Sequence, residues 1–215
     1  MKAMNPAAVL RLLLPALLAL CLTGCRTARH VSRPFVLAID AGHGGNDQGA
    51  AGRRSLEKDI TLQTAQRLCR LVRKRYKDVE VIATRPDNEA TSLADRAGMA
   101  NYFHADLFIS IHANSARGWA EGTETFIHPT AQGGRSERLA QLIEQQYVRQ
   151  GGRKSRGVKT ANFAVLRLTT MPAVLTEIGF ISNKEEEKFI ASRKGQKRLA
   201  RCLLDAFAAY RREYP

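Results

Sequence analysis

Three ionisable residues lie where an apolar run of the kind typical of a buried strand comes to its end. His43 closely follows residues 35–39, His112 follows residues 107–111, and Glu177 ends the run that begins at Ala173. Because the carboxyl ends of neighbouring parallel strands meet at one edge of a sheet, we expect these side chains to converge. Two such histidines and a carboxylate fit a catalytic zinc site, which commonly has two His ligands, one acidic ligand and an open position.

Three acidic residues are candidates for the carboxylate ligand. Asp40 ends the first apolar run, where it is better suited to orient the loop or to hydrogen-bond a ligand histidine. Asp47 lies in the glycine-rich segment 42–52, and Glu57 opens the first predicted helix at the same edge of the sheet. The residues alone leave the choice open.

The remaining sequence alternates between the two periodicities that predict strands and helices. We expect strands at 35–39, 79–83, 107–111, 123–127, 163–166 and 173–177, and helices at 55–76, 92–103, 135–149, 183–190 and 196–210. This order predicts an α/β fold, with a mostly parallel, twisted sheet of about six strands between helix layers, in a single catalytic domain.

Composition restricts the class of protein and its partners. The 215 residues carry a net charge of +14, which suits an anionic partner such as a lipid surface or a carboxylate-bearing wall polymer. We expect no nucleic-acid partner, because the N-terminus predicts export. Four cysteines do not make a disulfide scaffold. Cys69 and Cys202 lie in predicted helices and are expected to be buried free thiols, with a disulfide between them as the alternative.

The N-terminus resembles a bacterial lipoprotein signal. Its apolar run, residues 12–22, is shorter than the roughly 20 residues that a spanning helix needs, and it suits a signal peptide. The run ends in Leu22-Thr23-Gly24-Cys25, which predicts cleavage before Cys25 and lipidation of that residue. We therefore expect a signal peptide at 1–24, a short tether at 25–34 and the catalytic domain at 35–215. The lipid would anchor the exported protein at the periplasmic face, most consistently of the outer membrane.

Four segments, in order, carry a resemblance to a known family. They are residues 39–45 (IDAGHGG), 56–59 (LEKD), 110–114 (SIHAN) and 176–183 (TEIGFISN). Together they resemble the zinc-dependent N-acetylmuramoyl-L-alanine amidases of the type 3 family, over about residues 35–210. The one mild departure is Ala41, where the family often has proline.

This resemblance implies a function for each converging residue. It implies one Zn²⁺ held by His43, Glu57 and His112, with Glu177 as the catalytic acid and base. The implied substrate is peptidoglycan, cut at the amide between the muramyl lactyl group and L-alanine of the stem peptide. The alternatives are a zinc carboxypeptidase-like peptidase on wall peptides and a non-catalytic wall-binding lipoprotein. The sequence does not identify an activator protein.

Two further residues have predicted positions but less specific roles. Arg96 is expected to form a structural ion pair or to position other groups, rather than to bind substrate. Trp119 lies in the predicted loop 115–121, where it would either stack on substrate or cover a local apolar cluster.

Overall fold

Six strands form one sheet in the computed structural model, which describes residues 33–131 and 133–215. In chain order they are β1 (Phe35–Ala41), β2 (Val79–Ala83), β3 (Leu107–Asn114), β4 (Thr123–Ile127), β5 (Ser155–Thr160) and β6 (Ala173–Phe180). Their order across the sheet is β2-β1-β3-β6-β4-β5, and only the β4–β6 pair is antiparallel. The predicted fold class is therefore confirmed. The predicted signal peptide, Cys25 and almost all of the tether lie outside the described residues.

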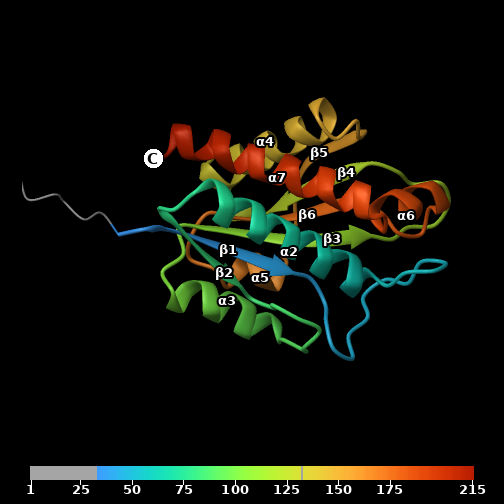
Figure 1. Cartoon of the computed structure of the whole chain (residues 1–215), viewed down its shortest axis with the longest axis horizontal. Helices are drawn as coiled ribbons and strands as arrows, with labels where there is room; N and C mark the ends of the chain where they lie inside the picture. The colour runs from blue at the N-terminus through green and yellow to red at the C-terminus, as the bar shows by residue number, and fades with distance from the viewer. Residues whose placement is uncertain (1–32, 132) are drawn as a thin grey trace, which may run out of the picture. The chain divides into compact units, whose positions relative to one another are not determined.

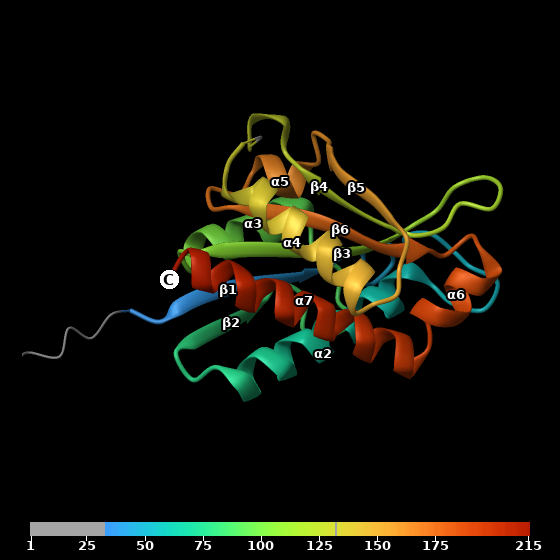
Figure 2. The ribbon, with the colours of Figure 1, turned by 90° about the horizontal axis from the view of Figure 1, so that it is seen from above.

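Helices cover both faces of the sheet (Figures 1 and 2). The helices α2 (Glu57–Arg75), α4 (Arg135–Arg149) and α7 (Arg193–Glu213) pack together on one face. The shorter α3 (Leu93–Tyr102) and α5 (Ala164–Arg167) lie on the other face. A further short helix, α6 (Lys184–Ile190), follows β6 and packs against that strand and α7.

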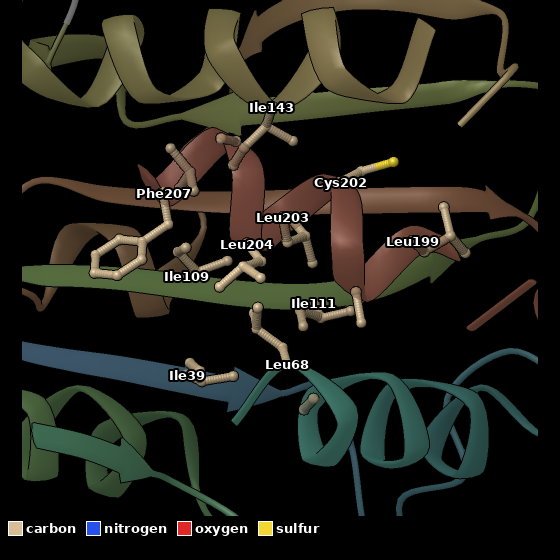
Figure 3. Packing of buried hydrophobic residues seen from close by; sticks show 14 of the residues in the cluster. Ile39, Leu68, Ile109, Ile111, Ile143, Leu199, Cys202, Leu203, Leu204 and Phe207 are labelled. Atoms are coloured by element: carbon tan, nitrogen blue, oxygen red, sulfur yellow. The ribbon is translucent and has the colours of Figure 1, made fainter. Parts of the chain in front are cut away.

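Successive side chains of a strand point to opposite faces of the sheet, and here both sets are apolar. This explains why helices cover both faces. In β1, Leu37 and Ile39 join the larger core beneath α2, α4 and α7, whereas Val36 and Ala38 join the smaller core beneath α3 and α5. Figure 3 shows the larger core, in which Phe207 of α7 lies near Ile109 of β3. Burial of each such large apolar side chain contributes about 1.5–3 kcal/mol, so this core supplies the rigid frame for the strand ends.

The strand predicted at 163–166 is wrong. Residues 164–167 form the helical turn α5, with Phe163 as its N-cap residue, and the strand lies earlier, in β5. A short apolar run has no periodicity that separates a strand from a buried helical turn. β5 was not predicted because its polar sequence SRGVKT has no buried face. It is an edge strand that pairs only with β4.

The other expected elements are observed with ends displaced by a few residues. The helices predicted at 55–76 and 196–210 run over Glu57–Arg75 and Arg193–Glu213, and Ser92 caps α3 by accepting a hydrogen bond from the Asp95 backbone. Cys69 and Cys202 are buried free thiols, as expected. No helix among the described residues has the length and apolar character needed to span a membrane.

Candidate metal centre

His43 stands in the loop after β1, in a backbone conformation that side chains rarely adopt. Its φ is 63°, in the left-handed region, and the Arg96 guanidinium donates a 2.6 Å hydrogen bond to its carbonyl oxygen. Gly42 precedes it, and a Cβ at that position would lie 2.3 Å from Cε1 of His112. Glycine is therefore required for the His112 ring to lie against the β1 loop.

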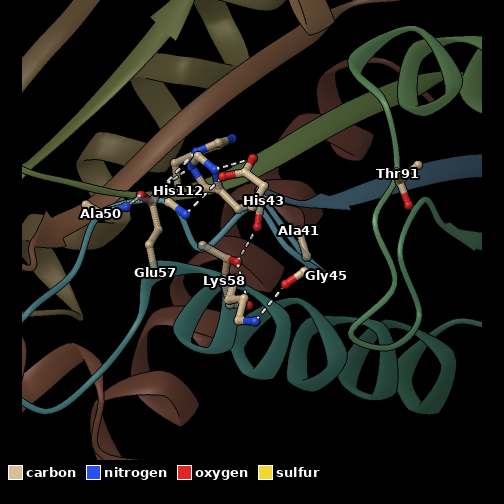
Figure 4. A network of polar contacts seen from close by, with 12 residues as sticks. Ala41, His43, Gly45, Ala50, Glu57, Lys58, Thr91 and His112 are labelled. Atoms are coloured by element: carbon tan, nitrogen blue, oxygen red, sulfur yellow. Dashed lines mark hydrogen bonds and ion pairs between the residues drawn. The ribbon is translucent and has the colours of Figure 1, made fainter.

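Glu57 brings the two histidines together (Figure 4). Its Oε1 lies 3.2 Å from His43 Nε2 and 3.0 Å from His112 Nδ1, although the three residues come from a loop, the first turn of α2 and β3. One ligand atom from each of the three lies within 4.8 Å of the others. The structure thus brings together the three residues that the sequence proposed as metal ligands.

The backbone fixes the Glu57 carboxylate in this position. Oε1 accepts a 2.9 Å hydrogen bond from the Ala113 amide, and Oε2 accepts one of 2.8 Å from the Ala50 amide. Burial alone would raise the pKa of Glu57, but the hydrogen bonds and charge of His112 and His43 outweigh it and hold the pKa well below its ordinary value. The carboxylate is therefore ionised, as a metal ligand must be.

Asp47 orients His43 from the other side of the ring. Its Oδ2 lies 2.8 Å from His43 Nδ1, which directs Nε2 toward Glu57. Burial lowers the pKa of His43, but the contacts with Glu57 and Asp47 outweigh burial and raise the pKa to about 9. Asp47, one of the three acids that the sequence left open, thus contacts the outer nitrogen of a candidate ligand instead of joining the three-residue cluster.

Asp40, the third acid, forms a buried network beneath the loop. Its carboxylate accepts hydrogen bonds from Thr84 (2.5 Å), Ser110 (2.6 Å) and Arg96 (2.8 Å). Burial alone would raise the pKa of Asp40, but the positive charge of Arg96 and the hydroxyl donors lower it. Arg96 also donates to the carbonyls of Ala41 and His43, so this ion pair positions the His43 loop, in line with the role expected for Arg96.

Glu177 lies in register with His112 across the β3–β6 pair, and with Glu124 across the β4–β6 pair. The three side chains consequently form a row on the sheet face that α3 and α5 cover only in part. Burial raises the pKa of the Glu177 carboxyl to about 7, which the histidines oppose only in part. Its Oε2 is buried and has no hydrogen-bond partner among the described residues.

Glu124 carries a polar cluster that the sequence did not predict. Its Oε1 accepts from Asn114 at 2.7 Å, and its Oε2 accepts from Arg156 at 2.8 Å and Lys159 at 2.5 Å. Burial alone would raise the pKa of Glu124, but these two cations lower it. The sequence carried no signal for this cluster, because Arg156 and Lys159 do not share the two-residue spacing of a strand face and lie beside a register shift between β4 and β5.

Trp119 is 84% exposed in the loop between β3 and β4. This exposure removes one of its two predicted roles, since the ring does not cover an apolar cluster.

Comparison with known proteins places this geometry in a family. The sequence profile of the N-acetylmuramoyl-L-alanine amidases matches residues 37–209. The chain belongs to this family. It is 36% identical over 193 residues to the uncharacterised protein YqiI of Bacillus subtilis, an alignment that covers 90% of this chain and 93% of YqiI.

Two family members with assigned activity are also similar. N-acetylmuramoyl-L-alanine amidase CwlM of Bacillus licheniformis is 39% identical over 154 residues, and the alignment spans 72% of this chain and 60% of CwlM. The crystal structure of N-acetylmuramoyl-L-alanine amidase from Clostridium difficile 630 superposes with a TM-score of 0.81 and 37% identity, over 86% of this chain and 100% of that one. The predicted family and enzyme class are confirmed, and these matches support an N-acetylmuramoyl-L-alanine amidase activity on the cell wall.

Proposed function

We propose that this amidase family member is a zinc-dependent enzyme that hydrolyses the amide between the N-acetylmuramoyl lactyl group and L-alanine of the peptidoglycan stem peptide. The observation that carries the proposal is the convergence of His43, Glu57 and His112 within 4.8 Å, beside Glu177. Two imidazoles and one ionised carboxylate form a set of nitrogen and oxygen donors that zinc prefers.

The residues around the cluster fit a bound zinc ion. Asp47 fixes the orientation of His43, and two backbone amides fix Glu57, so the ligands are positioned by the protein itself. When bound, zinc supplies Lewis acidity at the scissile carbonyl and lowers the pKa of a water molecule toward about 7.

Glu177 would move the proton in this reaction. Its buried Oε2 has no hydrogen-bond partner within the described part of the chain, so it is free to accept a proton from the attacking water. The same carboxyl can then return that proton to the amine that leaves with L-alanine. Glu124, the neighbouring acid, is already paired with Arg156 and Lys159 and is therefore the weaker candidate for a base.

The test uses the purified full chain and purified peptidoglycan. We expect release of stem peptides with free L-alanine amino termini, loss of this release on treatment with a chelator, and its return when zinc is added. Release of D-amino acids instead would identify the carboxypeptidase-like alternative. Binding to peptidoglycan with no product would identify the non-catalytic alternative. Full activity after complete metal removal would overturn zinc dependence.

We also propose that lipidated Cys25 anchors the enzyme at the periplasmic face of the outer membrane. The apolar run 12–22 and the motif Leu22-Thr23-Gly24-Cys25 support this proposal, and both lie outside the described residues. The acyl chains would contribute about 0.8 kcal/mol for each buried methylene.

A further inference from the structure

A pocket outside the candidate metal centre lies at the same end of the sheet. It has a volume of about 590 Å³, between the loop that precedes α2 and the helix α6. Figure 2 shows this loop and α6 next to each other at one end of the domain. We call it the basic pocket, and its polar lining consists of Arg53, Arg54, Ser55, Lys184, Glu187 and Lys188.

The basic pocket carries a net positive charge, because four cationic side chains and one carboxylate line it. Its two arginines and two lysines are exposed, and none of these four side chains forms an ion pair within residues 33–131 and 133–215. The single acid, Glu187, is 5% exposed, and its Oε1 accepts from the Arg54 amide at 2.8 Å and the Ser55 hydroxyl at 2.7 Å. That carboxylate holds the loop, and the four cations against one acid leave the pocket with an excess of positive charge for an anion from outside.

One short loop connects the basic pocket to the candidate metal centre. The Ala50 amide donates to Glu57 at one end of this loop, and four residues later the Arg54 amide donates to Glu187 at the other end. Four residues of fully extended chain reach at most about 14 Å. The loop therefore keeps the Glu57 contact of the metal centre and the Glu187 contact of the pocket close together, so that neighbouring units of one polymer can occupy both sites.

We infer that the basic pocket binds carboxylate groups of peptidoglycan, on a stem peptide adjacent to the one that is cut. This inference rests on the proposed function, which supplies a polymer whose stem peptides carry carboxylates at repeated intervals. Guanidinium and ammonium groups are the usual partners of carboxylates. The pocket thus selects the polymeric substrate, whereas the metal centre holds the bond to be cut.

The test measures binding of the full chain to insoluble peptidoglycan, with the Glu177→Gln substitution present throughout so that the substrate is cut at least about 100-fold more slowly. The pocket variant combines Arg54→Glu with Lys188→Glu, two exposed side chains. The hydrogen bond from Arg54 to Glu187 is retained, because the backbone amide of Arg54 donates it. The matched control combines Lys197→Glu with Arg201→Glu, which are exposed, line a different pocket on α7 and change the net charge equally. Circular dichroism and the melting temperature verify that both variants fold.

We expect the pocket variant to bind about tenfold more weakly, because reversed charges repel carboxylates, and the control to change binding by less than about twofold. The difference should shrink in 0.5 M salt and vanish on peptidoglycan whose carboxyl groups have been amidated. Equal losses in the two variants would overturn the inference, since only total charge would then matter. A difference that persists on amidated peptidoglycan would also overturn it, because the pocket would then not be binding carboxylate groups. The two proposals can fail separately. If the variants bind as expected but the wild-type chain releases no stem peptide, the proposed function is refuted and the carboxylate-binding pocket is not.

Discussion

Replacing Asp40 by asparagine should destabilise the fold far more than the same substitution at a surface ion pair. Asp40 is fully buried, and its partner Arg96 is 3% exposed, so the variant leaves a buried guanidinium without its counter-charge. Removal of one partner from such a pair costs about 3–5 kcal/mol. In a domain of this size each kcal/mol lowers the melting temperature by about 2–4 °C, which gives a fall of about 6–20 °C.

Asp78→Asn is the matched control. Asp78 pairs with Arg211 at 2.9 Å but is 65% exposed, so its loss should cost about 0.2–1 kcal/mol. Urea unfolding followed by circular dichroism measures both values, and an unchanged slope against urea shows that the two-state comparison holds. If the two variants lost the same stability, the buried network would not be what holds the His43 loop.

The effect of Asp40→Asn should also depend on pH. The folded-state pKa of Asp40 is below its ordinary value of 3.8, so the ionised carboxylate stabilises the fold fully above that value. This stabilisation is lost as the pH falls through the lower, folded-state pKa. The gap between wild type and variant should therefore stay constant above about pH 5 and narrow below pH 3.8.

Three other substitutions separate the remaining roles. Glu177→Gln should reduce turnover by about 10²- to 10⁴-fold at full zinc content, measured as release of stem peptides, and activity within a few-fold of wild type would move the base elsewhere. His112→Ala should abolish stoichiometric zinc binding, and full zinc occupancy measured by atomic emission would contradict the ligand assignment. Cys25→Ser should leave an unlipidated precursor, whereas incorporation of labelled fatty acid into that variant would rule out the proposed anchor.

The positions of the strand ends could be predicted because each of these strands is an apolar run that ends at an ionisable residue. His43, His112 and Glu177 each follow an apolar run with two buried faces, and parallel topology then requires that the ends of these runs share an edge. The choice among Asp40, Asp47 and Glu57 could not be made from the residues alone, because all three lie near the same strand end. The family resemblance selects Glu57, and the geometry then gives each acid a distinct role, as a buried ion pair for Asp40, an outer contact to His43 for Asp47 and a shared contact to both rings for Glu57.

The edge strand β5 and the basic pocket could not be predicted from local sequence patterns, because both depend on contacts between segments that are distant in the chain. β5 has a polar sequence and is ordered only through its pairing with β4, so no local pattern marks it as a strand. The basic pocket joins Arg54 to Glu187, which are 133 positions apart, and each residue alone is an ordinary surface or helix residue. The pocket forms because α6 packs against β6, which a local sequence pattern does not indicate.

The position of β6 has a consequence for the order in which the residues of the site appear along the chain. β6 is the last strand in the chain, yet it lies between β3 and β4, which the ribosome makes earlier. The three candidate zinc ligands are therefore complete well before Glu177 exists, and Glu177 reaches them only when β6 inserts into the middle of the sheet. An unfinished polypeptide that ends before β6 therefore carries the three candidate metal ligands without the proposed base.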